Sequence, residues 1–257
     1  MEKGAKESRV RSVSRALSIL KCFIKHPHQY GITEISETLN LSKGTVHLLV
    51  KTLEDEGFLE QLEETKKYRV GSMTYELGVA ALGELRIPSH IHLQQMSQEL
   101  SMPCYLAITI GIKAVLIEKA EPVIPFMMVM QIGAILPFHT SSMGKILLAG
   151  ADADQREELV STIELQALTP NTITNRDDLK KEIEEVEKQG YALDREETLP
   201  GVFCMAVPVK DSNGRVIAAL SLVGPSTTLN KDNYWQYLPT LQKYSALITK
   251  DMTYMKN

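Results

Sequence analysis

Three helical patterns followed by a hairpin pattern fill the first 70 residues, and this order constrains the fold more than any other feature of the sequence. The first pattern places its apolar residues on one helix face. These residues are Val13, Leu17, Leu20 and Ile24. A short second helix is expected from Thr33 as its N-cap, and Ser42 is expected to cap a third helix that Gly57 ends. Two strands are predicted at 58–62 and 66–70. Helix, short helix, turn, helix and hairpin in this order predict a winged helix-turn-helix.

The predicted third helix has a polar face opposite its apolar stripe. A helix of this kind fits the major groove of B-DNA when a second helix supports it. Gly44 lets the backbone approach closely, and Ser42 places a helix N-terminus where a phosphate can bind. Basic residues on one arm of the hairpin suit phosphate or minor-groove contact. The DNA-binding residues expected from these patterns are Arg15, Ser42, Lys43, Gly44, Thr45, His47, Lys51, Lys66, Lys67 and Arg69.

The net charge of −4, from 28 basic and 32 acidic residues, is unfavourable for a nucleic-acid partner when it is averaged over the chain. The charge is unevenly divided, however. Residues 1–51 carry nine Lys or Arg and four Glu, or +5, so the other residues carry −9. This asymmetry is typical of a basic contact module joined to an acidic domain. A solvated N-terminal tail would contribute part of this asymmetry as well. Any three-helix module produces similar apolar stripes and exposes ordinary solvated Lys and Thr, so the sequence is consistent with both a DNA-binding module and a plain three-helix module.

The segment 72–86 is predicted to be an amphipathic helix that Pro88 ends. Its apolar face must be covered by something, either by its own domain or by a second copy of the chain. A dimer contact is the preferred interpretation, because helix-turn-helix proteins generally bind paired half-sites. We therefore divide the chain into a DNA-binding domain at 1–71, a linker helix at 72–87 and a C-terminal domain at 88–257.

Helical and strand patterns are mixed beyond residue 88. The strands predicted there are 103–110, 114–120, 126–132, 202–210 and 215–223. The last two flank a clear hairpin turn, Asp-Ser-Asn-Gly at 211–214. Thr174 is expected to cap a long helix that Gly190 ends. These patterns predict an α+β domain in which helices pack on an antiparallel sheet.

The three cysteines, Cys22, Cys104 and Cys204, show neither a C-x-x-C spacing nor a metal-ligand cluster nearby. Reduced thiols in a cytoplasmic protein are the expectation. The first thirty residues lack the apolar core of a signal peptide. No apolar run reaches the roughly 18 residues that a membrane span needs. We expect a cytoplasmic protein with no cofactor, no metal and no membrane contact.

Three motifs connect the chain to a known family. Residues 42–47 read Ser-Lys-Gly-Thr-Val-His, and residues 136–145 read Leu-Pro-Phe-His-Thr-Ser-Ser-Met-Gly-Lys. A third motif begins with Gln-Gly-Tyr at 189–191 and continues at fixed spacings. It includes Asp194, Glu196, Glu197, Gly201, Val202, Cys204, Ala206, Pro208, Gly214, Ala218, Ala219 and Ser221. With these motifs the sequence resembles the IclR family of bacterial transcriptional regulators over nearly its whole length.

The resemblance implies an N-terminal winged helix-turn-helix domain and a C-terminal GAF-like α/β effector-binding domain, joined by a linker helix. It implies a DNA-binding transcriptional regulator whose affinity for double-stranded operator DNA is controlled by a small organic acid. We expect such a protein to repress a catabolic operon. Family members commonly form dimers that pair into tetramers, so the resemblance implies a homodimer or a dimer of dimers.

The family's effector site, carried over to the matching positions, implies an apolar wall, two backbone N–H donors at a helix start and three polar side chains. The apolar residues are Met128, Leu136 and Val202; the donors are Ser142 and Met143; the polar side chains are Asp194, Cys204 and Ser221. A ligand carboxylate would bind at the helix start, and its keto or hydroxyl groups would reach the polar side chains. Each of these residues could instead have only a structural role. Asp194 could cap a turn, for example, and Cys204 could fill the core.

Leu48 departs from the family pattern. It lies in the predicted third helix where many members have an arginine. The departure changes either the DNA sequence preference or a phosphate contact, and Lys51, one turn later, is a candidate to replace that contact.

Two other classes of function are alternatives to a regulator. A GAF-like thiol redox enzyme would use Cys204 as nucleophile and Cys104 as resolving partner, although no histidine lies near either in the sequence. A ligand-free interaction module would need no effector at all. We expect no enzymatic activity, because the sequence contains neither a recognisable phosphate loop nor a defined nucleophile and base.

Overall fold

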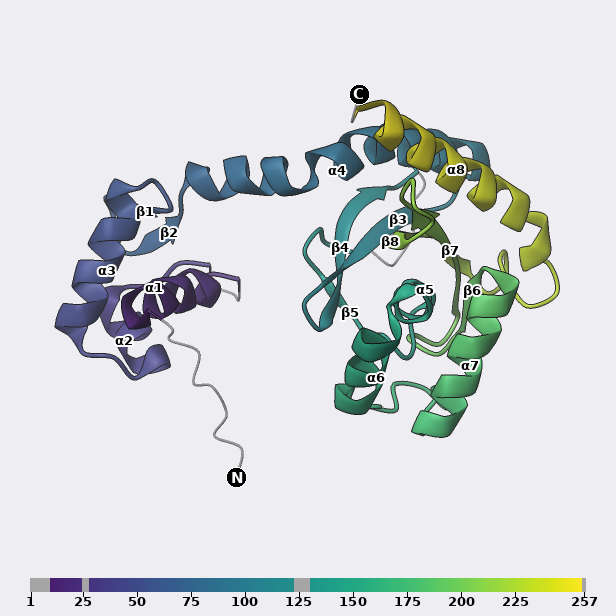
Figure 1. The fold of residues 1–257 in the computed structure, drawn as a ribbon, viewed down its shortest axis with the longest axis horizontal. Helices are drawn as coiled ribbons and strands as arrows, with labels where there is room; N and C mark the ends of the chain where they lie inside the picture. The colour runs from purple at the N-terminus through teal and green to yellow at the C-terminus, as the bar shows by residue number, and fades with distance from the viewer. Residues whose placement is uncertain (1–9, 25–27, 123–129, 256–257) are drawn as a thin grey trace. The chain divides into compact units, whose positions relative to one another are not determined.

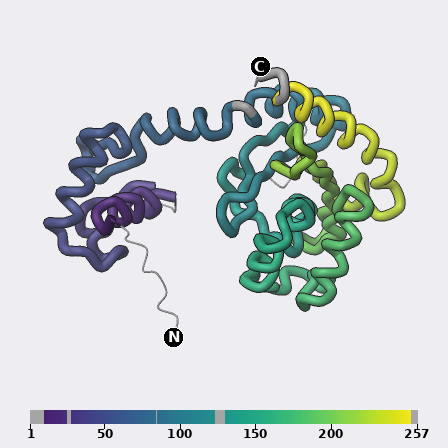
Figure 2. The backbone as a smooth tube through the Cα atoms, in the orientation of Figure 1, coloured from purple at the N-terminus to yellow at the C-terminus, as the bar shows by residue number. Residues whose placement is uncertain are grey.

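The computed structural model describes residues 10–24, 28–122 and 130–255. They divide into two compact units, with the boundary between Gly83 and Glu84 (Figure 1). Figure 2 follows the backbone through α4 (Ser72–Leu100), the helix that begins in the first unit and ends in the second.

The first unit consists of three helices followed by a two-stranded antiparallel hairpin. Its elements are α1 (Arg11–Cys22), α2 (Ile32–Leu39), α3 (Lys43–Asp55), β1 (Leu59–Gln61) and β2 (Tyr68–Val70). The core is formed by apolar residues of α1, α2 and α3 and of the hairpin. Ile19, Ile35 and Val46 at its centre are fully buried. The predicted winged helix-turn-helix is confirmed.

The apolar stripe predicted to bury α1 is wrong in its orientation. Val13, Leu17 and Ile24 are 56%, 51% and 70% exposed, whereas Ile19 and Phe23 are buried. The helix is apolar on two opposite faces, and contact with α2 and α3 selects the face that carries Ile19. The same unit corrects a helix start: α2 begins at Ile32 rather than after Thr33. The Glu34 carboxylate accepts the N–H of Gly31 at 2.6 Å and so caps that helix.

The prediction that Pro88 ends the linker helix is wrong, because α4 continues through Pro88 to Leu100. A proline inside a helix removes one backbone hydrogen bond and costs about 3 kcal/mol. Packing of the C-terminal half of α4 offsets this cost, since Leu85, Leu93 and Met96 are all buried. The hydroxyl of Ser89 also donates to the Leu85 carbonyl at 2.6 Å. This bond lies next to the position where Pro88 cannot donate a backbone hydrogen bond.

The second unit is built on a six-stranded sheet with the order β5-β4-β3-β8-β7-β6, in which every neighbouring pair is antiparallel. Its strands are β3 (Cys104–Ile110), β4 (Lys113–Ala120), β5 (Ile135–Leu136), β6 (Ala192–Arg195), β7 (Val202–Lys210) and β8 (Val216–Pro225). Its helices are α5 (Ser142–Gly150), α6 (Ala153–Thr162), α7 (Arg176–Gln189) and α8 (Leu238–Met255), with a 3-10 turn, η1 (Tyr234–Gln236). Figure 1 shows α5, α6 and α7 on one side of the sheet and α8 with the end of α4 on the other. The α+β class is confirmed.

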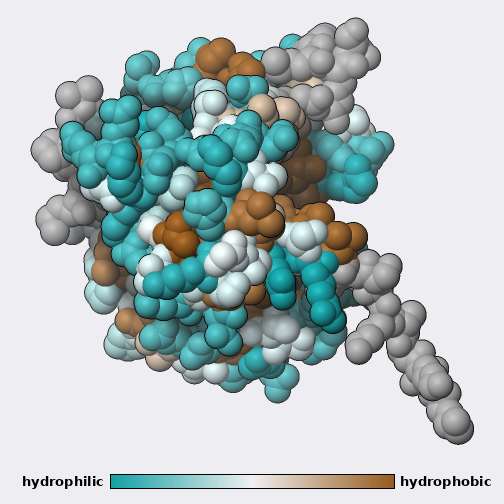
Figure 3. All heavy atoms as spheres, turned by 90° about the vertical axis from the view of Figure 1, so that its left-hand side faces the viewer, coloured by the Kyte–Doolittle hydropathy of each residue, from teal (hydrophilic) through white to brown (hydrophobic). Residues whose placement is uncertain are grey.

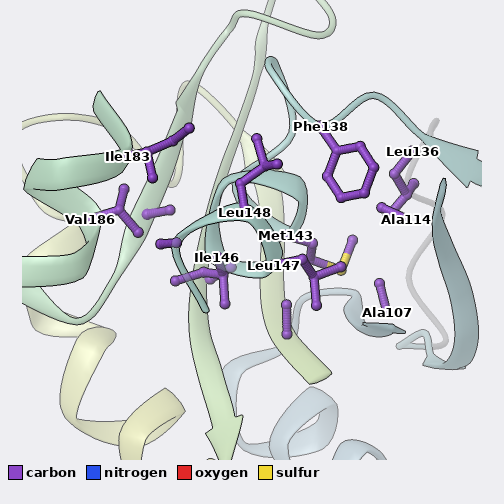
Figure 4. Packing of buried hydrophobic residues seen from close by; sticks show 14 of the residues in the cluster. Ala107, Ala114, Leu136, Phe138, Met143, Ile146, Leu147, Leu148, Ile183 and Val186 are labelled. Atoms are coloured by element: carbon purple, nitrogen blue, oxygen red, sulfur yellow. The ribbon is translucent and has the colours of Figure 1, made fainter. Parts of the chain in front are cut away.

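Helix α5 is the centre of this unit, because nearly all of its residues are buried. Figure 4 shows Ile183 and Val186 of α7 on one side of α5, and Leu136 and Phe138 on the other. The helix also lies against backbone: a side chain added at Gly144 would come within 2.6 Å of the Pro137 oxygen. A glycine is therefore required in the first turn of α5.

Two details of the second unit differ from the sequence predictions. The strand predicted at 126–132 lies partly outside the described residues, and residues 130–132 form no strand. The long helix is capped by Asn175 rather than Thr174, because the Asn175 side chain accepts the N–H of Asp178 at 2.8 Å. Within the described part of the chain, no helix combines the length and apolar character needed to cross a membrane.

Candidate nucleic-acid interface and ligand site

Helix α3 presents a solvated face opposite its buried residues. Val46, Val50 and Leu53 lie in the core, while Lys43 and His47 are exposed. Ser42 begins the helix as predicted, since its Oγ accepts the N–H of Thr45 at 3.2 Å. Ser42, Gly44 and Lys51 are exposed and Thr45 is half-buried. The predicted α3 residues therefore lie on one accessible helix surface, and a helix of this kind enters the major groove in helix-turn-helix proteins.

Several of the predicted DNA-binding cations are held by carboxylates. Lys51 contacts Glu54 and Asp55 at 3.1 Å, Lys67 contacts Glu34 at 2.7 Å, and Arg69 forms two hydrogen bonds to Glu60. Lys43 and Lys66 have no ion pair among the described residues, and Arg15 is exposed on α1. Exposed ion pairs contribute at most about 1 kcal/mol. A phosphate can therefore displace these carboxylates at little cost.

The predicted effector residues come from distant segments of the second unit, and the antiparallel register sets two of them, Asp194 and Cys204, side by side. Cys204 of β7 pairs with Asp194 of β6, and Ser221 of β8 pairs with Ala206 of β7 and Tyr105 of β3. The apolar members Leu136, Met143 and Cys204 belong to one buried cluster, and Val202 packs against it. Met128 lies outside the described residues.

The start of α5 is capped by the side chain of the residue before it. Ser141 is the N-cap: its Oγ accepts the N–H of Gly144, and its carbonyl accepts that of Lys145, both at 3.0 Å. Neither bond uses the N–H of Ser142 or Met143, the two predicted donors. A helix start combines such N–H groups with the positive end of the helix dipole, an arrangement that suits a carboxylate.

Asp194 holds a tight turn at the end of β6. Its Oδ1 accepts the N–H of Glu197 at 2.7 Å and that of Thr198 at 3.2 Å. Thr198 in turn donates to the Thr140 hydroxyl at 2.9 Å and so links this turn to the segment before α5. Desolvation raises the pKa of Asp194, although the hydrogen bonds from Thr198 and Glu197 oppose the shift. A ligand group that forms a hydrogen bond with the Asp194 carboxyl would do so away from bulk water, because Asp194 is buried.

The thiol of Cys204 is poorly suited to nucleophilic chemistry. Burial raises its pKa well above the ordinary value, and the neighbouring Asp194 adds to the shift. Burial also raises the pKa of Cys104. Since the thiolate is the reactive form of cysteine, the geometry gives the redox-enzyme alternative no support.

A buried ion cluster beside the site was missed at the sequence level. Lys145 of α5 is fully buried, and its Nζ donates to Glu197 at 2.6 Å, to Glu182 at 2.9 Å and to the Leu193 carbonyl at 2.9 Å. Desolvation raises the pKa of Glu197. Glu182 is also desolvated, but Lys145 and Arg195 outweigh this effect and lower its pKa. A single lysine inside the otherwise apolar α5 is the signal that predicts such a cluster, because a buried cation requires partners.

The opposite pKa shifts of Asp194 and Glu182 predict opposite pH dependences. A carboxyl with a raised folded-state pKa stabilises the fold when it is protonated, and this stability is lost as the pH rises through that pKa. We therefore expect Asp194→Asn to be more favourable, relative to the native protein, at about pH 7 than at about pH 4. Glu182→Gln serves as the matched control: its lowered pKa makes the substitution less favourable at the higher pH. Urea unfolding at both pH values measures these differences, and equal effects of Asp194→Asn at the two pH values would contradict the assignment.

Two family models match separate parts of the chain. One, for the IclR helix-turn-helix domain, matches residues 12–63, and the other, for the C-terminal domain of bacterial transcriptional regulator IclR, matches residues 79–250. The regulator XynR of Escherichia coli is 34% identical over 95% of this chain and 98% of its own length. The transcriptional repressor AllR of Klebsiella pneumoniae is 30% identical over 91% of this chain and 85% of its own. In fold, the chain matches the crystal structure of an IclR homolog complexed with 4-hydroxybenzoate from Microbacterium hydrocarbonoxydans. That match has a TM-score of 0.83 and 24% identity, and it covers 94% of this chain and 99% of the other.

Proposed function

The chain belongs to the IclR family of bacterial DNA-binding transcriptional regulators, and from that premise we propose that a small organic acid bound in the second unit controls its affinity for operator DNA. We further propose that it represses a catabolic operon in the absence of this signal. The relatives with which it shares nearly its whole length are regulators, one of them named as a repressor.

One observation carries the ligand proposal: the helix start of α5 and the Asp194 turn are joined by the Thr198–Thr140 hydrogen bond. In this proposal a ligand carboxylate would accept the N–H groups of Ser142 and Met143, and a hydroxyl or keto group of the same ligand would reach Asp194, Cys204 or Ser221. Leu136 and Val202 complete an apolar wall. The homolog of the same fold is complexed with 4-hydroxybenzoate, which also combines a carboxylate with a hydroxyl group.

We propose that α1 and the first half of α4 form the contact between two copies. The exposed face of α1 carries Val13 and Leu17, with Val10 just before the helix and Ile24 just beyond it also exposed. On α4, Tyr75, Leu77 and Val79 are exposed as well. Apolar faces of this extent are stable in water when a partner covers them. A homodimer, or a dimer of such dimers, would then present two copies of α3 to paired half-sites.

The second half of α4 provides the route by which a ligand would act on DNA binding. Glu118 of β4 is 3% exposed and accepts Arg86 Nε of α4 at 2.9 Å, with His90 Nδ1 at 3.5 Å. His92 of the same helix contacts Asp251 of α8 at 2.8 Å. Because α4 is continuous, a ligand that shifts the sheet would reorient α4 and change the spacing of paired DNA-binding units.

The proposal is tested by selecting a duplex from random DNA with the native protein and then titrating short organic acids. We expect operator affinity that falls steeply with salt, and Lys43→Ala and Lys66→Ala to lower the salt slope by about one each. Lys180→Ala, an exposed lysine of the second unit, is the control and should leave the slope unchanged.

The acid that raises the melting temperature should also change operator affinity, since both effects follow from binding to one conformation. An acid that binds tightly but leaves operator affinity unchanged would contradict the coupling. A ligand-free interaction module predicts that none of the acids raises the melting temperature.

A further inference from the structure

Leu48 is a large apolar side chain at the centre of the exposed face of α3. It is 68% exposed, whereas Val46 and Val50, two residues away on either side, are fully buried. At about 3.6 residues per turn, two positions correspond to roughly half a turn, so Leu48 projects directly away from the core. Any DNA that α3 enters would meet this side chain.

The neighbours of Leu48 leave its approach open. Gly44 lies one turn earlier on the same face, and a side chain added there would meet nothing within 4 Å. Helical side chains lean toward the N-terminus, so Leu48 covers the surface above Gly44. The remaining exposed residues of this face are hydrophilic, with Lys43 and His47 before Leu48 and Lys51 after it. Leu48 is therefore an isolated apolar spot within a basic, hydrogen-bonding surface.

We propose that Leu48 reads a thymine by packing against its 5-methyl group in the major groove. The methyl group is the apolar feature that distinguishes thymine there, and an aliphatic side chain is its natural complement. Leu48 cannot donate a hydrogen bond to a phosphate or a base, whereas the lysines around it suit the phosphates on either side. The inference rests on DNA binding of the IclR type and is independent of the proposed effector.

A second copy of the chain is a less suitable occupant of this surface. Two copies of α3 packed together would bring Lys43, His47 and Lys51 close to their own counterparts, which is unfavourable. On α1 the cation between Val13 and Leu17 is Arg15, which lies two positions from each of them and therefore on the other side of the helix. In the view of Figure 3, hydrophilic residues cover most of the molecular face and apolar residues form separate patches among them.

The test replaces each thymine of the selected duplex in turn by uracil, which removes only the methyl group. With the native protein, we expect one thymine per half-site at which uracil weakens binding about fourfold, the effect of one buried methyl group. With Leu48→Ala the same replacement should change affinity by less than a factor of about 1.5, because the contact is already lost. Leu48→Met keeps an apolar side chain of similar volume and should retain the discrimination.

The control for folding is direct, because an exposed residue of α3 can be replaced without disturbing the core. Leu48→Ala should keep the native melting temperature and the native oligomeric mass. The proposal is overturned if Leu48→Ala loses affinity equally for thymine and uracil duplexes, or if it changes the oligomeric mass. A selection that returns no preferred sequence would overturn it as well, since a base-reading residue requires sequence preference.

Discussion

Replacement of Lys145 by methionine is expected to lower the free energy of unfolding of the second unit by about 3–5 kcal/mol, the usual effect of removing one partner from a buried ion pair. Lys145 is fully buried and balances the carboxylates of Glu197 and Glu182. Methionine has a similar length but supplies no charge and no donor. Its introduction leaves the buried Glu197 carboxylate and the Leu193 carbonyl without their cation, while Glu182 keeps only Arg195 at 3.3 Å.

The measurement is urea unfolding followed by the fluorescence of Trp235, the single tryptophan, which lies in the second unit. Lys180→Met is the matched control, because Lys180 and Glu157 form an exposed pair at 3.5 Å whose loss should cost less than about 1 kcal/mol. The double variant Lys145→Met/Glu197→Gln should recover part of the stability, since glutamine leaves no uncompensated charge. A loss below about 1 kcal/mol in Lys145→Met would show that the cluster is not a major source of stability.

Replacement of Leu17 by glutamate is expected to weaken operator binding on the order of 100-fold, because it places a carboxylate in the proposed apolar dimer contact of α1. The monomer fold should persist, since Leu17 is 51% exposed and projects away from the core residues of α1. A charge buried between two copies without a partner favours dissociation, and a single DNA-binding unit binds one half-site only. Affinity for the paired site then falls toward that of the half-site.

Sedimentation of the native protein and the variant gives the oligomeric mass, and titration with the selected duplex gives the affinity. Leu17→Met is the control: it keeps an apolar side chain and should retain both the mass and the affinity. If Leu17→Glu keeps the native mass and the native operator affinity, α1 is not the contact between copies. A lost affinity with an unchanged mass would instead place Leu17 against DNA.

Much of the local structure was predictable because its signals lie within a few residues. Ser42 begins α3, Gly190 ends α7 in a left-handed conformation, and the turn at 211–214 joins β7 to β8. The effector residues were named through a family resemblance, and the register of β6, β7 and β8 shows how positions such as Asp194 and Cys204 meet.

Sequence periodicity by itself determined that the chain contains a helix-turn-helix with a hairpin and an α+β unit, because hydrogen-bonded caps, turns and amphipathic spacing act over one or two turns of chain. Only the tertiary structure decided which apolar face of α1 is buried and that α4 passes through Pro88. It also decided that Lys145 meets carboxylates 37 and 52 residues away. These outcomes depend on packing between distant segments. The free energy gained by burying apolar side chains between these segments exceeds the local conformational preference of the chain. A short stretch of sequence cannot show such contacts, because the two contacting residues are far apart along the chain.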